Sequence, residues 1–286
     1  MPFTLSMKWI PKACLGAVLA IATVGATYDA AAQDLMDKIK EDGKFVVATE
    51  AAYEPFEFIE DGEIVGYSKH ILDYVVSDLG VELEQLDLPF QGILPGLLAK
   101  KYDFVATSVS INSKRAQKYA YTRPIGTNQN VILIRADDDR INVPDDLSGM
   151  VVATQLASSM EPVAKEHSAS LEAAGNEGYD DLKLFQAIPE TFVALGSSQV
   201  DAVIVGSVQA AVAMKKRPGT YRIASKLGSP RYLAWVARPE DSAFRDYMNK
   251  KIGELVDNGK IAEWQMQWFG FTMDMPESGY LPEGAL

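Results

Sequence analysis

The chain has 286 residues, of which 48% are hydrophobic and 23% are charged, and its formal net charge at pH 7 is −12. This composition is typical of a folded protein with one large or two medium domains, and it excludes a disordered chain. The excess of negative charge also argues against nucleic acid or an anionic membrane surface as a partner.

The first 32 residues have the pattern of a secretory signal peptide. Two lysines precede an apolar run at 13–26, and the alanines at 30–32 offer a cleavage site. The run is too short for a typical membrane span, although an uncleaved anchor is the alternative interpretation. The only cysteine, Cys14, lies in this segment. We therefore expect an exported, periplasmic protein without disulfides or cysteine metal sites.

The following half of the chain alternates segments typical of strands and helices. Lys44–Thr49 reads as a strand, and residues 70–79 carry apolar side chains at helical spacing before Gly80. The other elements expected here are a helix at 35–41, a strand at 82–86, a helix at 91–100 and a strand at 104–106. This alternation predicts an α/β sheet.

The second half repeats the pattern. The expected strands are 150–154, 182–185 and 202–205, and the expected helices are 158–173, 189–195, 207–215, 241–257 and 260–269. Residues 97–107 resemble residues 195–205, which favours two lobes of similar build. We expect the chain to cross between the lobes near 127–131 and again near 230–232. The predicted division is 33–128 with 231–286 for one lobe and 129–230 for the other, with a ligand cleft between them.

Residues 101–124 suit the capture of a small anion. Ser108 and Ser110 follow a short apolar strand, and a helical turn then opens at Asn112 and carries Arg115. The end of a strand delivers hydroxyls and free N–H groups, and a helix N-terminus adds partial positive charge. A guanidinium can grip a carboxylate with two parallel hydrogen bonds. The alternative is a surface ion pair at Arg115 and serines that merely end the strand.

Several motifs resemble the extracellular solute-binding proteins of ABC importers, specifically the family that binds polar amino acids (family 3). The matching segments are ATE, YEPFE, EIVGY, ILPGL, KYD, SIN with Arg115, QLASS, VDA and WFG. They span essentially the whole chain after the signal peptide, in order. The resemblance implies an α/β fold of two Rossmann-like lobes joined by a two-strand hinge, as in type II periplasmic binding proteins. Such lobes close on their ligand.

The resemblance also implies a carboxylate clamp. Arg115 matches the carboxylate-binding arginine of the family, and Ser108 and Ser110 match neighbouring backbone and hydroxyl contacts. In the second lobe, Ser158 and Ser159 match a pair at a helix start that completes the clamp. The alternative for this pair is an N-cap and nothing more.

Three further positions match ligand-facing positions of the family. Tyr53 and Phe90 match aromatic residues that sandwich the ligand, although both could simply pack in the core. Glu50 matches an acidic position that can face the amino end of the ligand, and its alternative role is that of a solvated loop carboxylate.

The chain departs from the family pattern at the cationic end of the ligand. The family places an aspartate after a second-lobe strand to pair with an α-ammonium group, and Gly206 stands there. Either Glu50 or Glu161 replaces this carboxylate, or the ligand is not an ordinary α-amino acid. An acidic pair of the family is also absent, with Ser-Lys-His at 68–70 in its place. The anionic end of the ligand site is preserved.

The sequence offers little for catalysis. His70 and His167 are the only histidines, and no Gly-rich phosphate loop is present. We expect no cofactor, no metal site and no enzymatic activity. The chain would be a monomeric periplasmic component of an ABC transporter that captures a carboxylate-bearing solute by hinge closure and delivers it to the inner-membrane permease.

Two other functions are compatible with parts of the sequence. The same architecture resembles exported cyclohexadienyl or arogenate dehydratases, in which a carboxylic acid in the cleft assists the loss of water and carboxylate. In this chain that acid would be Glu50, Glu161 or Glu190, with a raised pKa. A sensor domain is disfavoured because no membrane span or signalling domain follows in the sequence.

Overall fold

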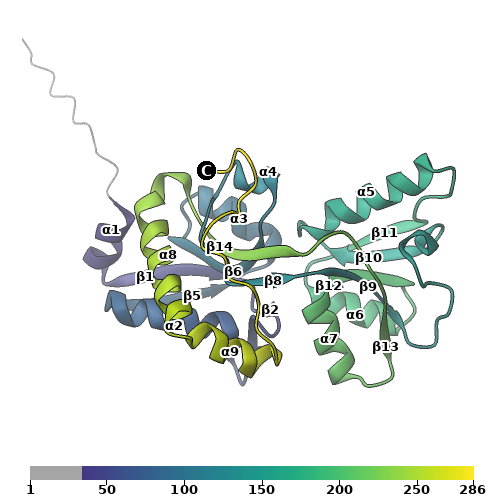
Figure 1. Cartoon of the computed structure of the whole chain (residues 1–286), viewed down its shortest axis with the longest axis horizontal. Coiled ribbons are helices and arrows are strands. Elements are labelled where there is room, and N and C mark those ends of the chain that lie inside the picture. The colour runs from purple at the N-terminus through teal and green to yellow at the C-terminus, as the bar shows by residue number, and fades with distance from the viewer. Residues whose placement is uncertain (1–33) are drawn as a thin grey trace, which may run out of the picture. The chain divides into compact units, whose positions relative to one another are not determined.

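Two main β-sheets carry the fold (Figure 1). The structure is a computed structural model that describes residues 34–286, so the expected signal peptide and Cys14 lie outside the described residues. The first sheet has the strand order β5-β1-β6-β14-β7, with β8 paired to β14, and the second has the order β11-β10-β12-β9-β13. A small antiparallel sheet, β2-β3-β4, accompanies them. The predicted α/β class is confirmed.

The first sheet is built from both ends of the described chain. Its strands are β1 (Lys44–Thr49), β5 (Glu82–Asp87), β6 (Phe104–Ser110), β7 (Ala120–Tyr121), β8 (Gly126–Asn128) and β14 (Arg231–Ala237). Strands β5, β1 and β6 are parallel, whereas β14 is antiparallel to β6, β7 and β8. The small sheet consists of β2 (Ala52–Tyr53), β3 (Glu57–Glu60) and β4 (Glu63–Val65).

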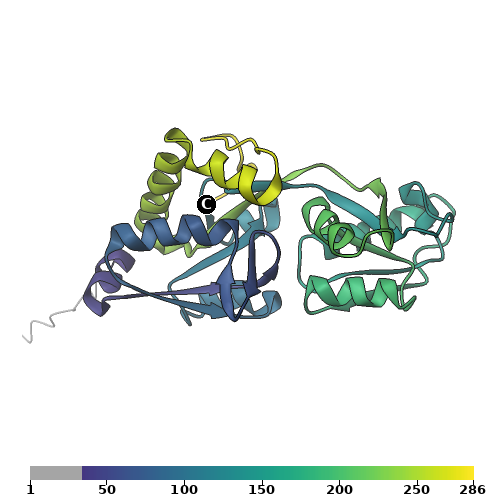
Figure 2. The same ribbon diagram turned by 90° about the horizontal axis from the view of Figure 1, so that it is seen from below.

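Helices of the first lobe also come from both chain ends. They are α1 (Leu35–Asp42), α2 (Tyr67–Leu79), α3 (Phe90–Leu98), α4 (Ser113–Ala116), α8 (Ser242–Asp257) and α9 (Lys260–Phe269). Helix α2 packs against α8 and α9 (Figure 2). It buries Ile71, Leu72 and Val75 on one face and ends at Gly80, whose φ of 68° is the left-handed conformation that glycine adopts without strain.

The second lobe is one continuous stretch of chain. Its strands are β9 (Asn130–Arg135), β10 (Val151–Gln155), β11 (Asp181–Phe185), β12 (Ala202–Gly206) and β13 (Tyr221–Lys226), and its helices are α5 (Met160–Ala173), α6 (Ile188–Gly196) and α7 (Ser207–Lys216). Strand β12 is buried along its whole length, as expected of a central strand covered on both faces.

The chain passes between the sheets at two neighbouring places. Strand β8 ends at Asn128 in the first sheet, and β9 begins at Asn130 in the second. Strand β13 lies in the second sheet, and β14 begins in the first sheet at Arg231, which is opposite Asn128. Both passages are short, so a small change of backbone dihedrals there can move one sheet relative to the other.

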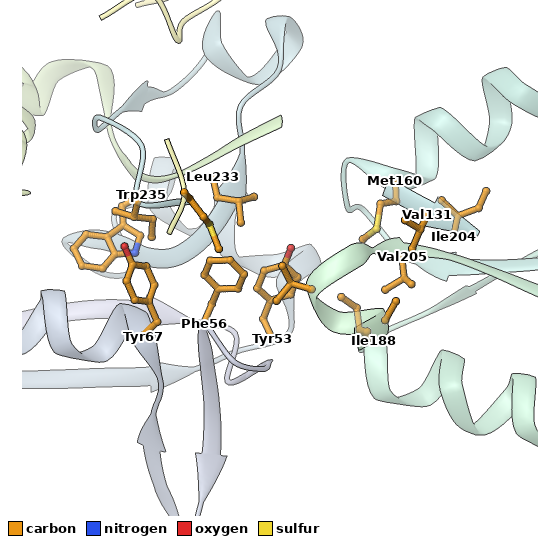
Figure 3. Close-up of a cluster of buried hydrophobic side chains, with 14 of the residues drawn as sticks. Tyr53, Phe56, Tyr67, Val131, Met160, Ile188, Ile204, Val205, Leu233 and Trp235 are labelled. Carbon is orange, nitrogen blue, oxygen red and sulfur yellow. The ribbon is translucent and has the colours of Figure 1, made fainter. Parts of the chain in front are cut away.

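Buried hydrophobic side chains of both sheets belong to one cluster (Figure 3). Figure 3 shows one group on the side of the first sheet and another on the side of the second; the labelled members are Tyr53, Phe56, Tyr67, Leu233 and Trp235, and Val131, Met160, Ile188, Ile204 and Val205, respectively.

One boundary differs from expectation in a way that matters for the site. The strand expected at 104–106 continues to Ser110, so Ser108 and Ser110 lie within β6 rather than after it. At this end of β6 the pairing partner is β14, with Leu233 opposite Ser110. Within residues 34–286, no helix combines the length and the hydropathy that a membrane crossing requires.

Candidate ligand-binding site

Arg115 sits where the end of β6 meets the second lobe. Asn112 caps α4, since its side-chain oxygen accepts the N–H of Arg115 at 2.9 Å. The guanidinium donates from Nη1 to the Ser110 carbonyl at 3.3 Å and from Nη2 to the Ala157 carbonyl at 2.8 Å. Ala157 belongs to the turn that precedes helix α5 of the second lobe. Arg115 therefore bridges the two lobes through backbone oxygens.

A cavity of about 780 Å³ opens beside this guanidinium. The first lobe contributes side chains from α3 and α4, among them Phe90 and Arg115, and the second lobe contributes Ser158 and Ser159. Arg231, the first residue of β14, also lines it. The volume falls in the range of small-molecule sites. The aromatic ring of Phe90 lies 5.3 Å from Arg115 Cζ, which is a cation–π distance.

The hydroxyl of Ser158 is engaged within its own turn. It donates to the Gln155 carbonyl at 2.7 Å and accepts the Met160 N–H at 3.2 Å, which is the local capping role considered for this residue. Ser159 lines the same cavity, and its carbonyl accepts from Arg231 Nη1 at 3.4 Å. The start of α5 thus presents two serines and a helix N-terminus to the cavity.

Four predicted site residues do not line this cavity. The Ser110 carbonyl accepts from Arg115 and from the Tyr121 hydroxyl, the latter at 3.2 Å. Tyr53 stacks on Phe56 with ring centroids 5.4 Å apart. The remaining two are Ser108 and Glu50, and both are buried. The structure therefore brings Arg115, Phe90, Ser158 and Ser159 together at the cavity and places the other four outside its lining.

Ser108 forms hydrogen bonds to Glu57, a buried carboxylate that the sequence did not indicate as a site residue. Glu57, only 1% exposed, accepts the Ser108 N–H at 2.7 Å, the Ser108 hydroxyl at 2.9 Å and the Thr107 hydroxyl at 2.8 Å. Burial raises the pKa of Glu57 to about 7, and these donors oppose that shift. The sequence offered only the position of Glu57 after Phe56, in a motif that carried no assigned role for it.

Glu50 is also buried, so its interpretation as a solvated loop carboxylate is wrong. Its side chain is 5% exposed and accepts a hydrogen bond from Gln155 Nε2, which comes from the second sheet. Burial raises the pKa of Glu50 to about 8; the Gln155 bond lowers it, while the neighbouring Glu57 and Asp87 raise it further. Glu50 therefore carries a proton near neutral pH.

Neutral amides surround the position where the family pattern has an aspartate. Asn128 Nδ2 donates to the Tyr53 hydroxyl at 3.0 Å and to Gln209 Oε1 at 2.6 Å. A Cβ atom at Gly206 would overlap with both amide side chains. A carboxylate at 206 would have to displace them, so this arrangement depends on glycine.

The other acidic and imidazole candidates are engaged elsewhere. Glu161 lines the cavity but pairs with Lys165 and accepts the Ala157 N–H at 2.7 Å. Glu190 caps α6 by accepting the N–H groups of residues 186 and 187 at 3.0 and 3.1 Å. His70 stacks on Trp264, and His167 Nδ1 lies 2.8 Å from the Tyr179 hydroxyl. Neither histidine lines the cavity.

Comparison with known proteins places this geometry in context. The model of the bacterial extracellular solute-binding proteins, family 3, matches residues 45–271. The L-cystine-binding protein TcyJ of Escherichia coli (strain K12) is 24% identical over 270 residues, which cover 93% of this chain and 98% of that protein.

Solved structures resemble the chain over both lobes. A mutant of ArgBP from T. maritima superposes with a TM-score of 0.74 at 28% identity, covering 82% of this chain and 99% of that one. An ancestral amino acid-binding protein, described as a precursor of cyclohexadienyl dehydratase, gives a TM-score of 0.73 at 25% identity, with 82% and 99% covered.

Proposed function

The chain belongs to the bacterial extracellular solute-binding proteins, family 3, and on that premise we propose that it is the periplasmic substrate-binding component of an ABC importer. Its ligand would be a small carboxylate-bearing solute, an amino acid or a derivative of one. The two-lobed fold is that of the structural relatives. The chain would act as a monomer and pass its ligand to the permease in the inner membrane.

One observation carries this proposal. The Arg115 guanidinium faces a cavity lined by both lobes, and its hydrogen bonds go to the carbonyls of Ser110 and Ala157. No carboxylate of residues 34–286 pairs with it. A guanidinium has five N–H donors in a planar fork, so donors remain for a ligand carboxylate. A half-buried cation that lacks an anionic partner carries a desolvation cost, and an anionic ligand would relieve that cost.

Ligand capture would link the lobes. A carboxylate held by Arg115 above the Phe90 ring lies next to the start of α5, where Ser158 and Ser159 and the helix N-terminus favour negative charge. Contacts to both sides favour the closed form, and the two short passages at 129 and at 227–230 allow the lobes to close. The lobe division 33–128 with 231–286, and 129–230, is part of this proposal and follows the membership of the two sheets.

A thermal-shift screen tests the proposal. The purified protein would be screened against amino acids, opines, betaines and dicarboxylates, because a solute that binds only the native state raises the melting temperature. A micromolar dissociation constant corresponds to about −8 kcal/mol, which a charged clamp with one aromatic contact can supply. We expect at least one carboxylate-bearing solute to bind, and we expect Arg115→Ala to abolish its shift. A shift that persists in Arg115→Ala would overturn the proposed clamp.

A dehydratase is the second candidate, and the state of Glu50 favours it. A general acid must hold a proton at working pH, and burial raises the pKa of Glu50 to about 8. Glu50, however, faces Gln155 and does not line the cavity. Incubation with prephenate or arogenate separates the two functions. Formation of an aromatic product that Glu50→Gln abolishes would replace the transport assignment.

A further inference from the structure

The cavity beside Arg115 is cationic although the protein is acidic. Five basic side chains line it against two acidic ones, in a chain whose formal net charge is −12. The basic residues are Lys114, Arg115, Lys118, Lys165 and Arg231, and the acidic residues are Glu161 and Glu166. Glu161 is already bound to Lys165 and to the Ala157 N–H. The local charge therefore exceeds what one bound carboxylate would neutralise.

Two of these basic side chains donate to carbonyl oxygens of the same turn. Arg115 Nη2 donates to the Ala157 carbonyl at 2.8 Å, and Arg231 Nη1 donates to the Ser159 carbonyl at 3.4 Å. Both acceptors belong to the single turn before α5, two residues apart. Arg115 reaches this turn from α4, whereas Arg231 reaches it from the first residue of β14, beside the passage between the lobes. Two guanidinium groups from separate elements thus converge on one wall of the cavity.

Neither guanidinium has an anionic partner in the part of the chain that the structure describes. Their hydrogen bonds go to carbonyl oxygens: Arg115 to those of Ser110 and Ala157, and Arg231 to that of Ser159. The two guanidinium groups also interact electrostatically. Burial lowers the pKa of Arg115, and the charge of Arg231 lowers it further. Like charges held close together in a partly buried site repel each other unless anions lie between them.

We propose that the ligand carries two carboxylate groups, one held by Arg115 and the other by Arg231. This inference rests on the proposed function, which requires only one carboxylate. A single carboxylate would leave the second guanidinium enclosed and unpaired when the lobes close, whereas a dicarboxylate pairs both with bidentate hydrogen bonds. The cavity volume of about 780 Å³ lies in the upper part of the usual range for small-molecule sites, so it can hold a solute with two separated acidic groups.

Matched pairs of solutes test the inference. Each pair compares a dicarboxylate with a related monocarboxylate: L-glutamate with L-glutamine, L-cystine with S-methyl-L-cysteine, and octopine with L-arginine. Isothermal titration calorimetry would measure each dissociation constant at one salt concentration. We expect at least one dicarboxylate to bind about tenfold or more tightly than its partner, as a charge-assisted contact provides.

Variants at position 231 assign the preference to the second guanidinium. We expect Arg231→Gln to weaken the dicarboxylate by about tenfold or more and its monocarboxylate partner by less than about threefold. Arg231→Lys keeps the charge but loses the planar fork, so it should fall between these values. Lys101→Gln is the matched control, because it removes the same charge from an exposed residue outside the cavity. Melting of each variant without solute shows whether it is folded.

The outcomes separate this inference from the proposed function. Equal binding of both members of every pair, or an equal effect of Arg231→Gln on both, would overturn the dicarboxylate ligand and leave solute capture through Arg115 intact. Binding of a solute that Arg115→Ala does not weaken would overturn the proposed clamp itself. A dicarboxylate preference that disappears in Arg231→Gln and persists in Lys101→Gln supports the inference.

Discussion

Glu50 and Gln155 occupy corresponding places in the two sheets and are joined by a hydrogen bond. Glu50 directly follows β1, and Gln155 is the last residue of β10. Gln155 Nε2 donates to Glu50 Oε1 and also to the Gln186 carbonyl, the latter at 3.1 Å. This bond connects the carboxyl ends of β1 and β10, which lie in different lobes and are each parallel to their neighbours in their own sheet. The protonation state of Glu50 therefore bears on how the lobes meet.

The stability of the protein should depend on pH through Glu50. Burial raises its pKa from 4.5 to about 8, so the folded state holds a proton that the unfolded state releases. The contribution of Glu50 to the free energy of unfolding is complete below the pKa that Glu50 has in the unfolded state. It is lost as the pH rises through the pKa that Glu50 has in the folded state. The slope is at most about 1.4 kcal/mol per pH unit for one proton.

Urea unfolding of wild type and Glu50→Gln between pH 5 and pH 9, an interval of about four units, measures this effect. The difference between the two proteins isolates Glu50, because Glu57 titrates in both. We expect the variant to gain stability relative to wild type as the pH rises. Glu63→Gln, at an exposed residue of β4, is the matched control and should follow wild type. Parallel curves for wild type and Glu50→Gln would show that Glu50 is ionised throughout.

Replacing Arg115 by alanine should weaken the solute identified by screening by about 100-fold or more, because a buried charge-assisted contact is lost. The change also removes the bonds to the carbonyls of Ser110 and Ala157. Lys101→Ala, at an exposed residue outside the cavity, should change the affinity little. Calorimetric titration of both variants measures the difference. An unaltered affinity in Arg115→Ala would show that another residue holds the carboxylate of the solute.

Phe90 should contribute to affinity through its ring. The ring lies 5.3 Å from Arg115 Cζ, and a cation–π contact of this kind is worth about 0.5–1 kcal/mol. Phe90→Leu keeps an apolar side chain at this buried position, so we expect a fold with nearly wild-type melting and an affinity lower by about two- to fivefold. Equal affinity of the two proteins would limit Phe90 to packing in the core.

Gly206→Ala should destabilise the protein by about 1–3 kcal/mol, since the added Cβ forces the side chains of Asn128 and Gln209 to move. Gly92→Ala in α3 is the matched control. Apart from its chain neighbours and the backbone of its own helix, nothing lies within 4 Å of a Cβ built at Gly92, so the change should stabilise the helix by about 0.5–1 kcal/mol. Urea unfolding measures both variants. Similar effects of the two substitutions would mean that the side chains of Asn128 and Gln209 can move aside without loss of stability.

The sequence predicted the fold better than it predicted the site. Local signals such as the apolar spacing in α2 and its stop at Gly80 located helices within a few residues, because they act over one or two turns. Tyr221–Lys226 was not expected as a strand, because its half-exposed side chains lack a clear alternation and its pairing with β9 is distant in the chain. Strand β9 itself was expected only as part of a crossing.

Long-range geometry explains what the site prediction lacked. Arg115, Phe90, Ser158 and Ser159 meet at one cavity, as a clamp requires. Arg231 was passed over because its position, next to a crossing between lobes, acquires meaning only when β8 and β14 pair. Glu50 was expected to face the ligand or solvent, and Glu57 had no assigned role. Only the packed structure distinguishes a buried carboxylate from a solvated one.

The placement of β14 also sets an order in which the protein can assemble. Strands β9 to β13 follow one another between Asn130 and Lys226, so the second lobe can complete its sheet from a single continuous segment. Strand β14 lies between β6 and β7, and the sheet of the first lobe stays incomplete until residues 231–237 have emerged. During synthesis, the lobe that begins first in the chain must therefore finish last, with the unpaired edge of β6 waiting for its neighbour.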